Sequence, residues 1–285
     1  MIIKYLLLLA FSSYLLAQDT IHSSVSTYYE NKTFSNSTQK YDGVVYGIGG
    51  DIHYNDSEYR FTYEHGDTKT KQPPLDKDLR TDKLFLKYAH SFNDSLEANV
   101  NYINILGDNI AITDGGVALG AGLTYNINKK TAFNFTQFYT DYKDFNVYQS
   151  DFKLDFKTKI EDIKMKLSFI AKYIILDEEN PNGFTKYAQD DYLTTAIKFH
   201  SHYNTYHFGA GAYLGKRVFA IMDDGFKIQH HAMEFDRTYA VGVGKSISDF
   251  VLRFQYIYQR AVELPAQNGK NVEVQNLRFI ANYKF

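Results

Sequence analysis

Apolar and polar side chains alternate along most of the chain after Ser23. In the stretch "DFVLRFQYIYQ", Phe250, Leu252 and Phe254 share one face, and the residues between them, such as Arg253, share the other. A period of two is the signature of a β-strand, because successive side chains of a strand point to opposite sides. The same alternation recurs in "VYQSDFKLDFKTK" (147–159) and "IKMKLSFIAKY" (163–173). The pattern therefore predicts an all-β fold.

Turn-forming residues interrupt this alternation in two classes of break, which follow one another along the chain. The short breaks are 54–59, 92–96, 127–131, 158–162, 203–206 and 246–250. The long ones are 34–43, 66–81, 106–116, 176–191, 219–232 and 264–271, and 141–146 is short for its class. Counting strands between them predicts one domain of about 14 antiparallel strands, within the range 12–16, joined as consecutive hairpins.

The amino-terminal residues predict an export signal. Lys4 gives a positive start, Tyr5 to Leu16 form an apolar run, and Ala17 is small enough for a cleavage site. The run is about twelve residues long and too short for a membrane-spanning helix, which needs roughly 20. We therefore expect a signal peptide over 1–17 and a mature domain over 18–285.

Composition and charge argue against several other classes of protein. The formal net charge is −2, and charges of both signs are spread throughout, so nothing indicates a nucleic-acid partner. The chain has no cysteine, which excludes a lipoprotein anchor, a disulfide framework and a thiolate metal site. We expect no cofactor.

The chemistry of the polar face favours a membrane barrel. Lys, Arg, Asp, Asn, Gln, Gly and His occupy this face on nearly every predicted strand, and Phe, Leu, Tyr and Ile occupy the other. A soluble barrel small enough to fill would have packed Val, Ile and Leu inside, although a soluble β-fold stays open as an alternative. The pattern fits a transmembrane antiparallel up-and-down β-barrel with a water-filled lumen and a girdle of Tyr and Phe in place of Trp.

The last predicted strand, "VEVQNLRFIANYKF", alternates throughout and ends on Phe285. A final Phe after an alternating strand resembles the terminal signal of Gram-negative outer-membrane barrels, which their insertion machinery recognises. Together with the signal peptide and the alternating connections, it makes the chain resemble the outer-membrane porin class, and the size matches its monomeric 14-stranded members. The resemblance implies a monomer among the lipids of the cell outer membrane, with Phe285 as the membrane-insertion signal.

The charged luminal residues predict passive diffusion of small hydrophilic solutes or ions through a porin-like channel. Charge lining sets ion preference in such pores, and the count here leans slightly cationic, so we expect a weak preference for anions. Alternatively, the same charges pair across neighbouring strands and stiffen the wall. The predicted pore-lining residues are Lys153, Lys157, Lys164, Lys166, Lys172, Lys198, Arg217, Arg253, Arg278, Asp151, Asp155 and Asp162.

Two other functions stay open, a surface adhesin or anchor whose loops plug its lumen and an outer-membrane enzyme. The sequence gives little support to an enzyme, because "AHSFND" near His90 departs from the His-x-Ser-Asn pattern of outer-membrane phospholipases. The acids of "MDDG" (Asp223, Asp224) and "DEEN" (177–180) are expected to be solvated charges in external loops.

The stretch "FHSHYNTYHFG" places His200, His202 and His207 close together. A two-residue turn on Asn204 and Thr205 would put His202 opposite His207 at the luminal mouth. Three interpretations compete: polar filling of the lumen, a proton-sensitive element, and a zinc or copper site. His230 and His231, in the predicted external loop 219–232, could add a second switch.

Overall fold

The computed structural model describes residues 21–72, 75–107, 111–178, 187–265 and 270–285. The expected signal peptide lies outside these residues. Within the described part of the chain, no helix is long and apolar enough to cross a membrane.

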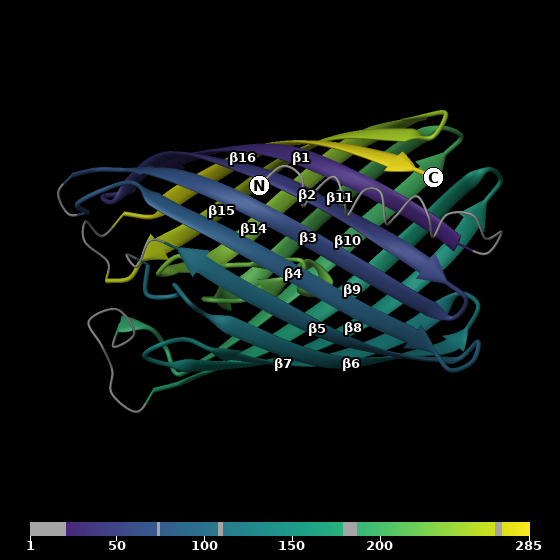
Figure 1. The fold of residues 1–285 in the computed structure, drawn as a ribbon, viewed down its shortest axis with the longest axis horizontal. Helices are drawn as coiled ribbons and strands as arrows, with labels where there is room; N and C mark the ends of the chain where they lie inside the picture. Colours follow the sequence, from purple (N-terminus) through teal and green to yellow (C-terminus); the bar gives the residue numbers. More distant parts are fainter. Residues whose placement is uncertain (1–20, 73–74, 108–110, 179–186, 266–269) are drawn as a thin grey trace, which may run out of the picture.

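Fourteen antiparallel strands form a closed barrel, as predicted (Figure 1). Each strand pairs with its neighbour in the chain, except that β11 pairs with β14 across a short inserted sheet. The barrel strands are β1 (Ile21–Ser35), β2 (Lys40–Tyr54), β3 (Ser57–Thr70), β4 (Leu79–Ser91), β5 (Leu96–Gly107), β6 (Val117–Asn128), β7 (Thr131–Asp141), β8 (Asn146–Ile160), β9 (Ile163–Asp177), β10 (Asp191–Tyr203), β11 (Tyr206–Arg217), β14 (Met233–Ile247), β15 (Phe250–Glu263) and β16 (Val272–Lys284). The insertion holds β12 (Ile221–Met222), the 3-10 turn η2 (Asp223–Gly225) and β13 (Lys227–Ile228).

Pairing of β1 with β16 closes the barrel, in a register that runs from Ser24 opposite Lys284 to Ser35 opposite Glu273. Closure satisfies the backbone of both terminal strands, because an open sheet edge in hydrocarbon would leave N–H and C=O groups without partners. The last amide also takes part, since Phe285 N–H donates to Ser23 C=O over 2.9 Å. The two ends of the described chain thus lie at one end of the barrel (Figure 1).

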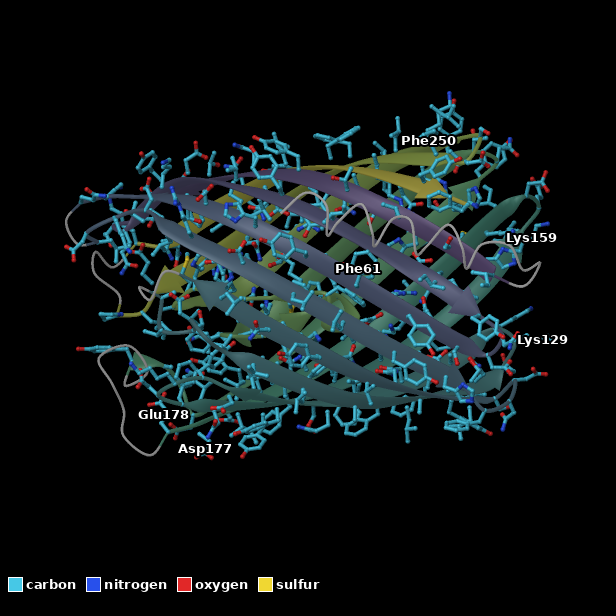
Figure 2. The ribbon with its side chains drawn as sticks, in the orientation of Figure 1. Phe61, Lys129, Lys159, Asp177, Glu178 and Phe250 are labelled. Carbon is cyan, nitrogen blue, oxygen red and sulfur yellow. The ribbon has the colours of Figure 1, made fainter. Side chains whose placement is uncertain are left out.

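The two ends of the barrel differ in the length of their connections, as the two classes of break in the sequence predicted. Tight turns join the strands at the end that carries Lys129 and Lys159, and longer connections lie at the end that carries Asp177 (Figure 2). Four of the two-residue turns begin with a residue at positive φ, namely Asn55, Glu161, Asn204 and Ser248. Two-residue hairpin turns need such a left-handed residue, because its twist matches that of the flanking strands.

The outer surface of the barrel is apolar to a degree that suits only lipid. Large side chains such as Ile48, Leu123 and Phe279 are about half exposed, and they alternate with residues that face inward. Aromatic pairs lie toward both ends, with Tyr59 on Tyr88 at 5.0 Å near the tight turns and Tyr139 on Tyr148 at 5.2 Å near the long connections. A soluble protein does not expose apolar area of this extent.

The interior differs from the water-filled lumen that the sequence predicted. Residues 218–232, which we call the plug segment, fold into the barrel and do not form an external loop (Figure 1). Val218, Phe219 and Ile221 are almost completely buried and belong to one apolar cluster with luminal residues of β4 to β11. The expectation of an external loop was wrong because the length and polarity of a connection do not show whether it folds outward or into the lumen. An apolar run beside a wide lumen is stabilised by burial inside it.

Gly47 on β2 allows a luminal tyrosine to lie flat on the wall, because a Cβ at Gly47 would come 2.1 Å from the ring of Tyr28. That ring also lies under the guanidinium of Arg278 at 4.7 Å. We expect Gly47→Val to displace Tyr28 and to lower the free energy of unfolding by about 1–3 kcal/mol. Urea titration of the barrel in lipid vesicles, followed by heat-modifiable electrophoretic mobility, measures the loss. Gly209→Ala is the control, because the nearest atom to a Cβ there is 3.4 Å away, and equal stability of the two variants would contradict the packing described.

Candidate functional site

The tip of the plug segment is held to the barrel wall by two ion pairs. Lys198 Nζ on β10 lies 2.8 Å from Asp223 Oδ1, and Lys153 Nζ on β8 lies 2.6 Å from Asp224 Oδ2. The sequence analysis placed both carboxylates in an external loop as solvated charge, and this was wrong. They lie inside the lumen, about half exposed to its cavity. The tip is a tight turn of left-handed backbone, since Asp223, Asp224 and Gly225 all have positive φ.

The lysines keep both carboxylates ionised. Attraction by Lys198 holds the pKa of Asp223 below its usual range. Enclosure in the lumen raises the pKa of Asp224, but attraction by Lys153 outweighs this effect and the net shift is downward. A pKa lowered by folding means that the ion pairs stabilise the plugged state above the ordinary carboxylate pKa and are lost only as pH falls through the lowered value.

Polar side chains of β8 and β9 fix the backbone of the plug segment. The Gln149 amide both donates to Ile221 C=O at 2.7 Å and accepts from Ile221 N–H at 2.8 Å, as a neighbouring strand would. Lys172 donates to the same carbonyl at 3.0 Å and forms an ion pair with Asp151. Thr113 Oγ1, in the connection after β5, donates to His230 C=O at 2.7 Å. These bonds satisfy backbone groups that would otherwise be buried without partners.

One side of the plug segment is apolar and closely packed. The ring of Phe219 lies 4.8 Å from that of Phe145 and 5.8 Å from that of Tyr142, which themselves lie 4.8 Å apart. This contact covers the lumen next to β7 and β8.

The opposite wall, on β16, β1, β3 and β4, carries a network of buried charges. Glu30 pairs with Arg278 and lies 3.3 Å from Lys32. Glu64 lies 2.9 Å from Lys83 and accepts a hydrogen bond from Tyr28. A cavity of about 50 Å³ separates this network from Lys227, His230 and His231 of the plug segment. Glu30 is absent from the predicted pore lining, although alternation with the outward-facing Tyr29 places it on the luminal face of β1.

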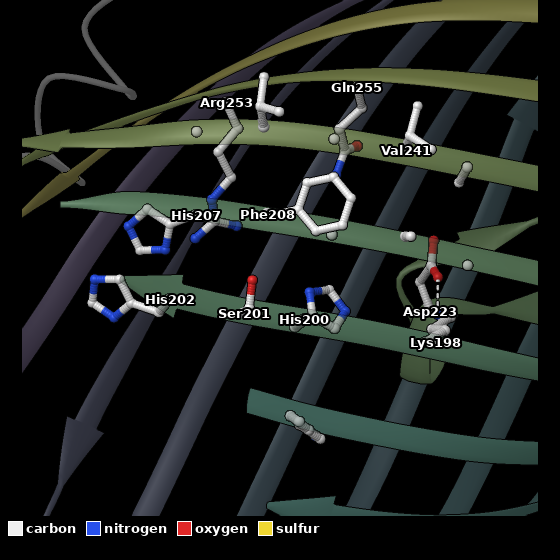
Figure 3. A pocket seen from close by; sticks show the side chains of 18 of the residues that line it. Lys198, His200, Ser201, His202, His207, Phe208, Asp223, Val241, Arg253 and Gln255 are labelled. Atoms are coloured by element: carbon white, nitrogen blue, oxygen red, sulfur yellow. Dashed lines mark hydrogen bonds and ion pairs between the residues drawn. The ribbon is translucent and has the colours of Figure 1, made fainter. Parts of the chain in front are cut away.

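A larger cavity of about 850 Å³, which we call the vestibule, lies between the plug segment and the tight-turn end (Figure 3). Its roof includes Met222, Asp223 and Gln229 of the plug segment. The predicted site residues that line it are Lys157, Lys164, Lys166, Lys198, Arg253, Arg278, His200, His202 and His207. The structure thus brings most of the predicted cations and all three clustered histidines into one space.

The remaining predicted pore residues lie elsewhere. Arg217 is fully buried, donates to Thr238 Oγ1, and lies over the rings of Tyr213 and Phe235. Asp162 lies in the turn after β8, largely exposed and 4.0 Å from Lys159, because the strand ends at Ile160. The others lie on the wall behind or beside the plug segment, and these are Lys153, Lys172, Asp151 and Asp155.

The histidine hairpin has the predicted register. His202 pairs with His207 across the turn, and their rings stack at 4.3 Å with an interplanar angle of 9°. His207 Nε2 lies 2.8 Å from Ser246 Oγ, whereas His202 Nε2 has no hydrogen-bond partner among the described residues. Within the same residues, no group of three or more His, Asp or Glu side chains is placed to hold a metal ion.

His230 and His231 are not in an external loop, in contrast to expectation. Both lie in the plug segment, inside the barrel, and their rings are 4.1 Å apart. Burial, followed by repulsion from neighbouring lysines, lowers the pKa of each well below its usual value. Both rings are therefore neutral at physiological pH, which disfavours their role as a second switch.

Comparisons with known proteins concern the fold. No protein-family model matches the sequence, and no curated protein matches it. Among solved structures, a bacterial polysaccharide outer membrane secretin is similar with a TM-score of 0.58 and 9% identity over 92% of this chain and 98% of that chain. The toluene transporter TbuX of Ralstonia pickettii gives a TM-score of 0.56 at 11% identity, over 94% of this chain and 90% of its own.

The monoaromatic hydrocarbon channel CymD gives a TM-score of 0.53 at 10% identity, over 94% of this chain and 88% of that chain. This chain has the fold of outer-membrane β-barrel channels. At such identities the likeness does not extend to the solute.

Removal of the two tip charges is expected to loosen the plug segment. Asp223→Asn combined with Asp224→Asn keeps the side-chain shapes but abolishes both ion pairs, so we expect the single-channel conductance to rise about twofold or more. Because both carboxylates stay ionised well below neutrality, the wild-type conductance set by these pairs should not change between about pH 8 and pH 5. Asp78→Asn is the control, because it breaks the Lys69–Asp78 ion pair near the long connections, away from the plug segment. An unchanged conductance in the double variant would argue against the ion pairs as a restraint.

The stacked histidines give a separate pH prediction. Protonation of both rings would place two like charges side by side, next to Lys164 on the adjacent strand, so their repulsion would disturb the hairpin at low pH. On this hypothesis His202→Gln removes any change in conductance between about pH 5 and pH 8. Identical pH profiles of wild type and variant would leave the histidines as polar filling of the lumen.

Proposed function

We propose that this chain is an outer-membrane channel through which small hydrophilic solutes or ions diffuse passively. The observation that carries the proposal is a closed 14-stranded barrel whose wide lumen is lined by charges and narrowed by an inserted segment. By the usual orientation of such barrels, the tight turns face the periplasm and the long connections face outward. The chain then acts as a monomer, inserted through its last strand and Phe285.

The route for solutes follows the charged side of the plug segment. Its apolar side is packed against β7 and β8, whereas its other side faces Glu64, Lys83 and Arg278 across a narrow cavity. Oppositely charged walls bind and orient hydrated solutes while they slow apolar ones. We expect diffusion along this side to involve displacement of the plug tip, which is held by two ion pairs whose carboxylates are about half exposed to the cavity.

The plug segment also favours a second candidate, a barrel that serves as a surface anchor or adhesin with a sealed lumen. Burial of Val218 to Met222 and the two hydrogen bonds between Gln149 and Ile221 would keep the segment in place. An anchor of this kind would conduct only after the segment is removed. The two functions therefore predict different currents from the same protein.

Single-channel recording of the folded barrel in a planar bilayer tests the proposal. The channel predicts discrete current steps from the wild type, and larger steps when residues 219–231 are replaced by a short Gly-Ser linker, because the lumen is then wide throughout. A variant that shortens only the external connection 71–78 is the control and should leave the steps unchanged. Current from the linker variant alone would support the sealed anchor, and current from neither would contradict a pore.

A further inference from the structure

The vestibule carries a strong excess of positive charge. Within the described part of the chain, its lining includes ten Lys and Arg side chains and one carboxylate, that of Asp223. Asp223 is itself paired with Lys198. The overall composition does not explain this excess of positive charge, since the formal net charge of the chain is −2. The cations are therefore concentrated in this cavity.

Strand register places several of these cations directly opposite one another. On the luminal face of β8 and β9, Lys157 lies opposite Lys166 and Lys159 lies opposite Lys164. Like charges at directly opposed positions destabilise a sheet. Asp155 offsets one of them, at 2.9 Å from Lys166.

Several cations of the vestibule form no ion pair with a described residue, and three of them lie on the luminal faces of β8, β9 and β15. Lys157, Lys164 and Arg253 form no ion pair with any described residue, and all three are exposed to the cavity. Arg253 reaches the vestibule from β15, which is separated from β9 by β14, β11 and β10 in the barrel wall. A wall arranged in this way gains stability when an anion supplies the missing charge from the cavity side.

The histidines continue the two basic rows onto β10 and β11. His200 lies opposite Lys166, and His202 lies opposite Lys164 and His207. Imidazole N–H groups donate hydrogen bonds to anionic oxygens, and all three histidines line the vestibule beside the basic rows. Figure 3 shows this hairpin and Arg253 around one space.

Glycines keep the vestibule large beside these rows. Gly209 and Gly211 on β11 and Gly242 and Gly244 on β14 line it where other residues would fill it. At ~30 Å³ for each water molecule, its volume of about 850 Å³ holds roughly 25–30 waters. The space is larger than a single hydrated ion needs and suits a solute with several charged groups.

From these observations we infer that the vestibule binds an oligoanion, a small solute with two or more carboxylate or phosphate groups. The unpaired Lys157, Lys164 and Arg253 supply the charge, and the histidines supply further hydrogen bonds. The inference deepens the proposed channel, on which it rests for the route by which the solute enters and leaves. It assigns the periplasmic half of the lumen to anion capture.

Isothermal titration of the folded barrel in neutral detergent tests this inference directly. The probes are inorganic tripolyphosphate and citrate, which separate phosphate from carboxylate ligands, with acetate as the singly charged control. We expect saturable binding of at least one oligoanion, weakened by salt because exposed charges are screened beyond ~10 Å at 0.1 M. Binding of acetate should be much weaker. If neither tripolyphosphate nor citrate binds, the inference is overturned.

Variants locate the site. Lys164→Gln combined with Arg253→Gln should weaken binding of the oligoanion about tenfold or more, because two charges that contact it are lost. Lys143→Gln combined with Lys216→Gln removes the same charge from the end with long connections and should change binding less than about twofold. Gly209→Leu fills the vestibule without changing charge and should also weaken binding. Equal loss in both double variants would show general attraction to a basic protein and would overturn the site.

Heat-modifiable mobility confirms that each variant is folded before titration. Because binding is measured without current, the site and the channel can fail separately. Binding by a barrel that does not conduct would refute the channel but keep the site, and conduction without binding would refute the site alone.

Discussion

The hydrogen-bonding needs of the peptide backbone in hydrocarbon constrain every other feature of this structure. A backbone N–H or C=O group without a partner in lipid costs several kcal/mol, so the sheet has to close on itself. Twelve residue pairs between β1 and β16 achieve this closure. Closure in turn fixes which side chains face lipid and which face the lumen, because a shift of one residue would exchange the two faces of a strand.

A closed barrel of this width leaves an interior that its own wall cannot fill. Small barrels of about 8 strands fill their interior with side chains, whereas larger ones enclose channels or plugs. Here the plug segment packs apolar residues against one wall and presents Asp223 and Asp224 to lysines of the same side of the lumen. The charged network around Glu30 and Glu64 and the basic vestibule remain as the polar parts of the interior. This division gives the interior an apolar side and a polar side.

The strand pattern was predictable because lipid imposes a strict alternation. The pairing of Tyr203 with Tyr206 and of His202 with His207 followed from turn length alone. The direction of the connection after β11 was not predictable, since Val218 to Met222 and the following acids suit either an exposed loop or an inserted one. Only the lumen shows that Asp223 meets Lys198, and their 25-residue separation in sequence gives no signal of this contact. The clustering of the cations in one vestibule was likewise not predictable, because it depends on how the plug segment divides the lumen between the strands that carry them.

Cross-linking tests most directly whether the plug segment lies inside the barrel. The chain has no cysteine, so Lys153→Cys with Asp224→Cys creates a single thiol pair, and Phe152→Cys with Asp224→Cys creates a matched pair whose wall residue faces lipid. A short thiol-specific cross-linker applied to the folded barrel should join residues 153 and 224 and leave 152 and 224 unjoined. Failure to join 153 and 224, or equal yields for both pairs, would show that residues 218–232 do not occupy the lumen.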